Sequence, residues 1–160
     1  MKKLNSVLGA FLLTTAFGVS AHASNPDVYV VNFRNNADAK SQQLDQALPS
    51  AVAMAGVNAE EVVIDTSNAA KWEKGAHEAF DRDIVPVFNQ WVGLPGFAAI
   101  VDADSKQVIG CVNSTFQADE IAAELKKMAA KAKGKAFTSN ASISSKTTKC
   151  PAPYNEDPGL

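Results

Sequence analysis

A turn and a buried strand follow one another in the stretch Gly93-Leu94-Pro95-Gly96-Phe97-Ala98-Ala99-Ile100-Val101-Asp102. The unbroken apolar run over 97–101 predicts a strand that is covered on both faces. The polar loop 102–106 then leads into a second apolar strand over 107–112. A link this short joins antiparallel strands, so we expect these two segments to form a hairpin.

The segments before this hairpin read as strand, helix, strand and helix. A β-branched and aromatic run over 27–33 predicts a first buried strand, and 61–65 predicts a second. A helix follows each strand, because Asp38 can cap the first helix and Ser67 or Asn68 the second.

Proline and glycine set the limits of the first helix. Pro49 should kink it or end it near Leu48, since proline lacks the N–H that the helix needs. A helix-favouring piece then resumes at Ala51 and ends at Gly56.

Apolar spacing defines the later helices. An i, i+4, i+7, i+8 spacing predicts one buried face in the second helix, made of Trp72, Ala76, Ala79 and Phe80. We interpret both tryptophans, Trp72 and Trp91, as core residues. A short helical turn should begin at Pro86. A last helix should run to about Lys133 from a capping box of Ser114 and Gln117.

This order of elements resembles the thioredoxin fold over residues 28–131. The loop Gly93-Leu94-Pro95 is similar to the loop in which thioredoxin-like proteins place a cis-proline before their third strand. The resemblance implies an α/β domain over 24–133, with a four-stranded mixed sheet flanked by helices. It also implies that Gly93, Leu94 and Pro95 offer backbone groups to an extended peptide. The alternative is a tight turn that only packs.

The chain departs from the family at the position of its catalytic cysteines. Thioredoxin-like oxidoreductases carry Cys-x-x-Cys at the start of the helix after the first strand. The segment 34–41 holds no cysteine here. Counting from Phe33 places Asp38 and Ser41 at the two sulfur positions, and counting back from Pro49 places Ser41 and Leu44 there. Disulfide exchange needs an attacking thiolate, so we predict no catalytic residue at these positions.

The first 23 residues read as an export signal. Lys2 and Lys3 precede a run without charges over 4–19, and Ala21 and Ala23 form an A-x-A cleavage pattern. We therefore expect cleavage after Ala23 and a periplasmic mature chain, and the alternative is an uncleaved anchor. After cleavage we expect no stable membrane insertion.

Charge is distributed unevenly along the mature chain. Residues 24–120 hold 6 basic and 14 acidic side chains, whereas 121–160 hold 7 basic and 3 acidic ones. A nucleic-acid-binding domain would show a basic patch on its folded part, so we predict no nucleic-acid partner. The polar composition of 134–160 predicts a flexible tail.

Two cysteines remain after cleavage, Cys111 and Cys150. An even number of cysteines in an oxidising compartment indicates a disulfide, which would pin the tail to the domain. The alternatives are two thiols too far apart to meet, or pairing with another protein.

Neither a metal site nor a cofactor site is predicted. His77 is the only histidine after the signal, and no partner residues at ligand spacing accompany it, so we place it at the surface. Asp102 and Asp104 lack the spacing of a calcium loop and should be solvated. The chain also has no glycine-rich phosphate loop and no nucleophile elbow.

The sequence therefore predicts a periplasmic thioredoxin-fold protein without thiol-disulfide activity, which binds other envelope proteins as an adaptor. A conjugation or secretion system is one context, by analogy of fold. The alternative is a redox protein that works through Cys111 and Cys150. A third possibility is an accessory protein whose tail makes the contact.

Overall fold

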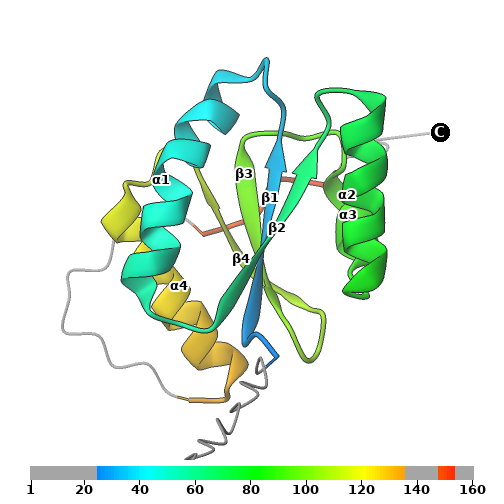
Figure 1. Ribbon diagram of the computed structural model, residues 1–160. Coiled ribbons are helices and arrows are strands. Elements are labelled where there is room, and N and C mark those ends of the chain that lie inside the picture. Colours follow the sequence, from blue (N-terminus) through cyan, green and yellow to red (C-terminus); the bar gives the residue numbers. More distant parts are fainter. Residues whose placement is uncertain (1–24, 136–147, 154–160) are drawn as a thin grey trace, which may run out of the picture.

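A computed structural model describes residues 25–135 and 148–153 as one α/β domain (Figure 1). The predicted export signal and most of the predicted tail, 136–147 and 154–160, lie outside the described residues. No helix among the described residues is long and apolar enough to cross a membrane. The elements in chain order are β1 (Val28–Arg34), α1 (Ala39–Ala55), β2 (Ala59–Asp65), α2 (Ala69–Asp81), α3 (Val85–Trp91), β3 (Phe97–Asp102), β4 (Val108–Asn113) and α4 (Ala118–Ala132).

The four strands form one mixed sheet in the order β2-β1-β3-β4. β1 pairs with β2 in parallel, and β1–β3 and β3–β4 are antiparallel. The predicted hairpin and the predicted four-stranded mixed sheet are thus confirmed. The parallel pair follows from the long connection through α1, which carries the chain back before β2 begins.

Helices cover both faces of the sheet, with α1 and α4 on one face and α2 and α3 on the other (Figure 1). Two hydrophobic cores result. Successive residues of β1 point to opposite faces of the sheet. Val28 and Val30 lie in the core under α1 and α4, and Val31 and Phe33 lie in the core under α2 and α3. Phe33 stacks on Phe97 and meets Trp91 edge-on, so aromatic rings fill the core under α3.

The helix α1 runs from Ala39 to Ala55 without ending at Pro49. The prediction of an end near Leu48 was therefore wrong, and the predicted end at Gly56 is confirmed by its left-handed C-cap. Proline removes a single intrahelical hydrogen bond. Leu44, Leu48 and Ala51 are fully buried, and that burial outweighs the lost bond.

The buried face of α2 differs from the predicted one. Ala79 is buried as predicted and Ala76 is partly buried, but Trp72 is 45% exposed and Phe80 74% exposed. Gly75, which was not predicted, is buried. A Cβ at Gly75 would lie 3.4 Å from the Cα of Ile64 on β2, so the helix approaches the sheet closely at its small residues. This close approach leaves the large aromatic side chains outside the contact. Trp91, in contrast, is buried as predicted.

The N-terminus of α4 also differs from the prediction. The capping box consists of Gln117 and Glu120, not Ser114 and Gln117. Glu120 reaches back to the N–H of Gln117 at 2.7 Å. The helix therefore starts one turn later than a Ser114 cap would place it.

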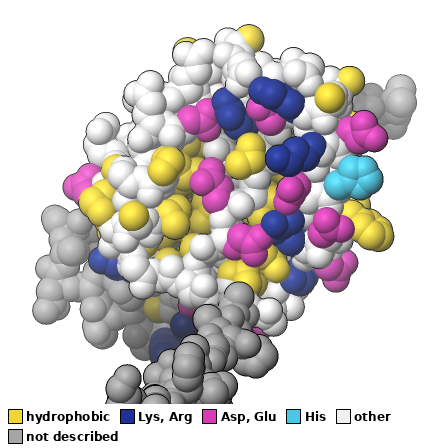
Figure 2. Space-filling model, viewed as in Figure 1, with side chains coloured by type: hydrophobic (Ala, Val, Ile, Leu, Met, Phe, Trp, Pro, Cys, Tyr) yellow, Lys and Arg dark blue, Asp and Glu magenta, His cyan; other side chains and the backbone are white. Residues whose placement is uncertain are grey.

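Charged side chains of both signs are interspersed on the face seen in Figure 2. Asp65, at the end of β2, contacts Lys71 at 3.0 Å and accepts hydrogen bonds from the backbone and the hydroxyl of Ser67. Burial alone would raise the pKa of Asp65. The hydrogen bonds from Ser67 and the charge of Lys71 outweigh it, so the pKa lies below its ordinary value of 3.8.

This lowered pKa predicts how stability changes with pH. A carboxylate whose pKa is lower in the folded state stabilises the protein above its unfolded pKa and loses this contribution in acid. We expect Asp65→Asn to lower the free energy of unfolding by about 1–2 kcal/mol at pH 7. The difference from wild type should shrink as the pH falls below 3.8. Urea unfolding at a series of pH values measures this, with the exposed Asp81→Asn as control. An unchanged difference down to pH 2 would contradict the assignment.

Candidate functional site

Three segments meet at one edge of the sheet. Because β3 runs antiparallel to β1 and β4, the end of β1, the start of β3 and the end of β4 lie at the same edge. Phe33 pairs with Phe97, and Phe97 pairs with Asn113. The N-terminus of α1, the Pro95 loop (residues 93–96) and the residues after β4 are therefore neighbours.

Asp38 and Ser41 lie at the N-terminus of α1, and they are the two residues to which the count from Phe33 assigned the sulfur positions. Asp38 is the N-cap and accepts hydrogen bonds from the N–H of Ser41 at 2.7 Å and from its hydroxyl at 2.9 Å. Ser41 is fully buried and also accepts a bond from the N–H of Asn35. Leu44, which the count back from the proline selects together with Ser41, lies further along α1 and is buried in the core. The side chains of Asp38 and Ser41 take part in capping the helix, and neither carries a sulfur atom.

The Pro95 loop packs directly on this helix end. The N–H of Gly96 donates to the carbonyl oxygen of Phe33 at 2.8 Å, and Gly96 has a φ of +92°. A Cβ at this position would come within 2.8 Å of the Cβ of Lys40 and 3.0 Å of Asp38 Oδ1. Only glycine allows this approach. The described residues contain no cis peptide bond, so Pro95 is trans, unlike the family's proline.

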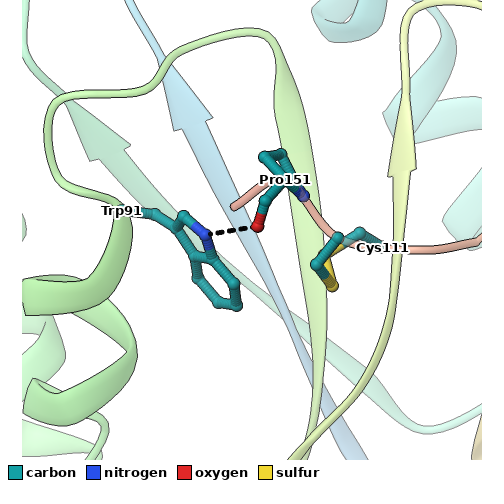
Figure 3. Close-up of a disulfide and its surroundings, with 4 residues drawn as sticks. Trp91, Cys111 and Pro151 are labelled. Atoms are coloured by element: carbon teal, nitrogen blue, oxygen red, sulfur yellow. Dashed lines mark hydrogen bonds between the residues drawn. A yellow bond between two sulfur atoms is a disulfide. The ribbon is translucent and has the colours of Figure 1, made fainter. Parts of the chain in front are cut away.

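The predicted disulfide between Cys111 and Cys150 is confirmed, with a Cα–Cα distance of 4.9 Å. It holds the segment 148–153, hereafter the strap, beside β4. The N–H of Cys111 donates to the carbonyl oxygen of Thr148 at 2.9 Å. Figure 3 shows the indole N–H of Trp91 reaching the carbonyl oxygen of Pro151, at 3.1 Å. The described part of the tail is therefore fixed on the domain at three points.

A cavity of about 400 Å³ lies between the Pro95 loop and the strap. Its wall is formed by α1, the start of β3, the end of β4 and the strap. The lining residues are Lys40, Pro95, Gly96, Phe97, Cys111, Val112, Asn113, Ser114, Thr115, Lys149, Cys150 and Pro151. Both predicted features, the proline loop and the disulfide, thus border one cavity.

No group of three or more metal-ligating side chains occurs in the described part of the chain. His77 is exposed on α2, as predicted. Asp102 accepts hydrogen bonds from the N–H groups of Asp104 and Ser105, both at 2.9 Å, so its carboxylate closes the hairpin loop.

Several lining residues were not found from the sequence. Lys40 and Lys149 lie 109 positions apart, and Ser114 was assigned to a helix cap instead. No local pattern marks them, because they meet only through the sheet and the disulfide. Of the predicted loop residues, Pro95 lines the cavity, while Gly93 and Leu94 do not.

The chain matches no protein-family model, no curated protein and no solved structure at a significant level. The four-stranded mixed sheet with helices on both faces is compatible with the thioredoxin-like architecture.

Proposed function

We propose that this protein is exported to the periplasm and binds other envelope proteins through the cavity beside the Pro95 loop, without thiol-disulfide activity of the thioredoxin kind. The predicted export signal supports the location. The proposed context is a conjugation or secretion system, of which this protein would be a component, by analogy of fold.

The observation that carries the proposal is the cavity itself, together with the residues at its α1 side. Asp38 and Ser41 stand where a nucleophilic sulfur would be required, so exchange cannot begin there. Pro95 and the end of β4 still form a recess at the edge of the sheet. A recess at the end of the sheet, beside the edge strand β4, suits an extended segment of a partner. We therefore infer that this end of the sheet serves binding, and that the N-terminus of α1 supplies no thiol chemistry.

A photo-crosslinking side chain placed at Thr115, which is exposed and lines the cavity, tests the proposal in intact cells. We expect a specific adduct with an envelope protein. The same group at the exposed Lys131 on α4 should give none.

Replacing Pro95 with alanine should reduce the Thr115 adduct about ten-fold, which corresponds to a loss of about 1.4 kcal/mol. Pro86→Ala, in the first turn of α3 and outside the cavity lining, is the matched control and should leave the adduct unchanged. A folded Pro95→Ala protein that gives the same adducts as wild type would refute the assignment of this surface.

A second candidate function is disulfide exchange through Cys111 and Cys150, favoured by their position in the wall of the same cavity. A thiolate of a partner dithiol would attack one sulfur and release the other as a thiolate, and the partner would end oxidised. Cys111 is almost fully buried, which restricts attack on its sulfur. An insulin-reduction assay tests this function by comparing the rate of wild type with that of the Cys111→Ala/Cys150→Ala variant. Equal, background-level rates would exclude this function.

A further inference from the structure

We infer that α2 carries a second docking surface, and that its occupant is a basic amphipathic helix of a partner protein. The surface consists of Trp72, Ala76 and Phe80, hereafter the aromatic row. None of these three residues lines the cavity beside the Pro95 loop. The inference therefore concerns a different face of the domain from the proposed function and goes beyond it.

The aromatic row is exposed although it is apolar. Phe80 is 74% exposed and Trp72 45% exposed, and Ala76 between them is partly buried. The ring of Trp72 meets the buried ring of Phe88 on α3 edge-on, with 5.7 Å between the centroids. One aromatic side chain of the row is therefore held in place before any partner binds, which lowers the entropy lost on binding. A contiguous exposed apolar row of this kind is typical of an interaction site.

The position of α2 on the sheet explains why folding leaves the aromatic row uncovered. Gly75 and Ala79 are buried, and each is followed by a residue of the aromatic row. Successive residues of a helix are rotated by about 100°, so the row is turned away from the sheet. A Cβ at Gly75 would lie 3.4 Å from the Cα of Ile64, and a contact this close leaves no room for aromatic side chains beneath the helix.

Carboxylates border the aromatic row on its outer side. Glu73 and Asp81 belong to the next row of α2, with His77 between them, and all three are exposed. Asp83 follows in the turn to α3, where its N–H donates to the carbonyl oxygen of Phe80 at 3.0 Å, and it is exposed as well. None of these three carboxylates forms an ion pair with another described residue.

The basic residues of α2 and of its C-cap do not neutralise this border. Lys71 and Arg82 form ion pairs with carboxylates outside the border. Lys74 lies two positions before Ala76 and is therefore on the opposite side of the helix from it. A partner with lysine or arginine beside its apolar face is thus complementary in charge to the aromatic row and its border.

A helix suits this surface better than an extended segment. The backbone groups within α2 are bonded inside the helix, so its surface offers no row of N–H and C=O groups to an added strand. A partner helix brings its own backbone hydrogen bonds, and its side chains at i, i+4 and i+7 can pack on a row with similar spacing.

Two other occupants fit this surface less well. A second copy of α2 would bring the carboxylates of both copies around one contact, where they would repel each other. The segment 154–160 of this chain holds Glu156 and Asp157 and no basic residue, so it does not complement the acidic border.

The test is a ¹⁵N–¹H chemical-shift titration of the disulfide-bonded protein with two designed helical peptides of about 18 residues. Both peptides have the same leucine face, and the flanking positions carry lysine in one and glutamate in the other. We expect the lysine peptide to shift the amides of α2 and α3 and to bind about ten-fold more tightly than the glutamate peptide. The difference should shrink at high salt.

Variants locate the effect. Phe80→Ala should weaken the lysine peptide about ten-fold, because it removes an exposed aromatic anchor. Met54→Ala is the matched control, since Met54 is an apolar side chain on α1 that is 49% exposed, and it should change nothing. Glu73→Gln should weaken the lysine peptide about three-fold and strengthen the glutamate peptide. Asp104→Asn, an exposed carboxylate of the hairpin loop, should alter neither.

Several results would overturn the inference. Equal affinity for the two peptides would refute the basic character of the partner, and no shift with either would refute the helix. Shifts confined to α1 or to the cavity would place the binding elsewhere. Shifts of the α2 amides on dilution of the protein alone would show that a second copy covers the row, and the same shifts in Tyr154→Ala would show that the segment 154–160 covers it. The Pro95-dependent adduct at Thr115 judges the proposed function separately.

Discussion

Removing the disulfide by Cys111→Ala/Cys150→Ala should lower the free energy of unfolding by about 3–4 kcal/mol, the largest effect we expect from any change outside the apolar core. The bond joins residues 39 positions apart. Without it, the unfolded chain gains the entropy of an open loop of that length. The folded state also loses the anchor of the strap, because the hydrogen bonds from Cys111 and Trp91 alone would have to hold it.

Urea unfolding of the oxidised wild type, the reduced wild type and the double variant measures this effect. The last two should have similar midpoints, well below that of the oxidised protein. Addition of a reductant to the double variant is the control and should change nothing. A reduced protein as stable as the oxidised one would show that the bond closes a loop which is already constrained in the unfolded state.

The loss of the strap should reach the cavity as well. Lys149, Cys150 and Pro151 form one of its walls. The Cys111→Ala/Cys150→Ala protein should therefore give less of the Thr115 adduct than wild type, even under conditions where the domain remains folded.

Gly96→Ala should destabilise the protein by about 3 kcal/mol, the second large effect. Alanine is strained at a φ of +92°, and its Cβ would meet the Cβ of Lys40 at 2.8 Å. The loop would have to move away from α1, and the hydrogen bond from the N–H of Gly96 to Phe33 would lengthen or break. Thermal and urea unfolding should show the loss, and amide shifts should change along the start of β3.

Gly56→Ala is the matched control for this prediction. Gly56 also has a positive φ, +58°, but a Cβ there would meet nothing within 4 Å. Its cost should be about 1 kcal/mol, from backbone strain alone. If both variants lost the same stability, the close packing of the Pro95 loop on α1 would not be a source of stability.

Local sequence determined the order and the ends of most elements. Short-range chemistry is sufficient for this, since a cap or a turn depends on residues within three or four positions. Asp38 and Asn68 cap their helices, Gly56 ends α1, and the polar loop 102–106 forces a hairpin. The pairing of Cys111 with Cys150 was predictable because the chain beyond residue 23 offers no other partner.

Helix periodicity determined only part of the buried face of α2. Trp72 and Phe80 share a side of α2 with Ala76, so the spacing was real. The sheet, however, accepts the helix at Gly75 and Ala79, where the backbone can approach Ile64. The same limit applies to Pro49. By local rules a proline ends a helix, but α1 continues here because the turns on both sides of Pro49 are anchored in the core.

The cavity depended on the tertiary structure alone. The sequence by itself determined a proline loop, a cysteine pair and the absence of a catalytic thiol at Asp38 and Ser41. Only the antiparallel pairing of β3 with β1 and β4 and the disulfide bring Lys40, Ser114 and Lys149 to one edge. Contacts between residues far apart in the chain leave no local sequence pattern, because these residues become neighbours only when the chain folds.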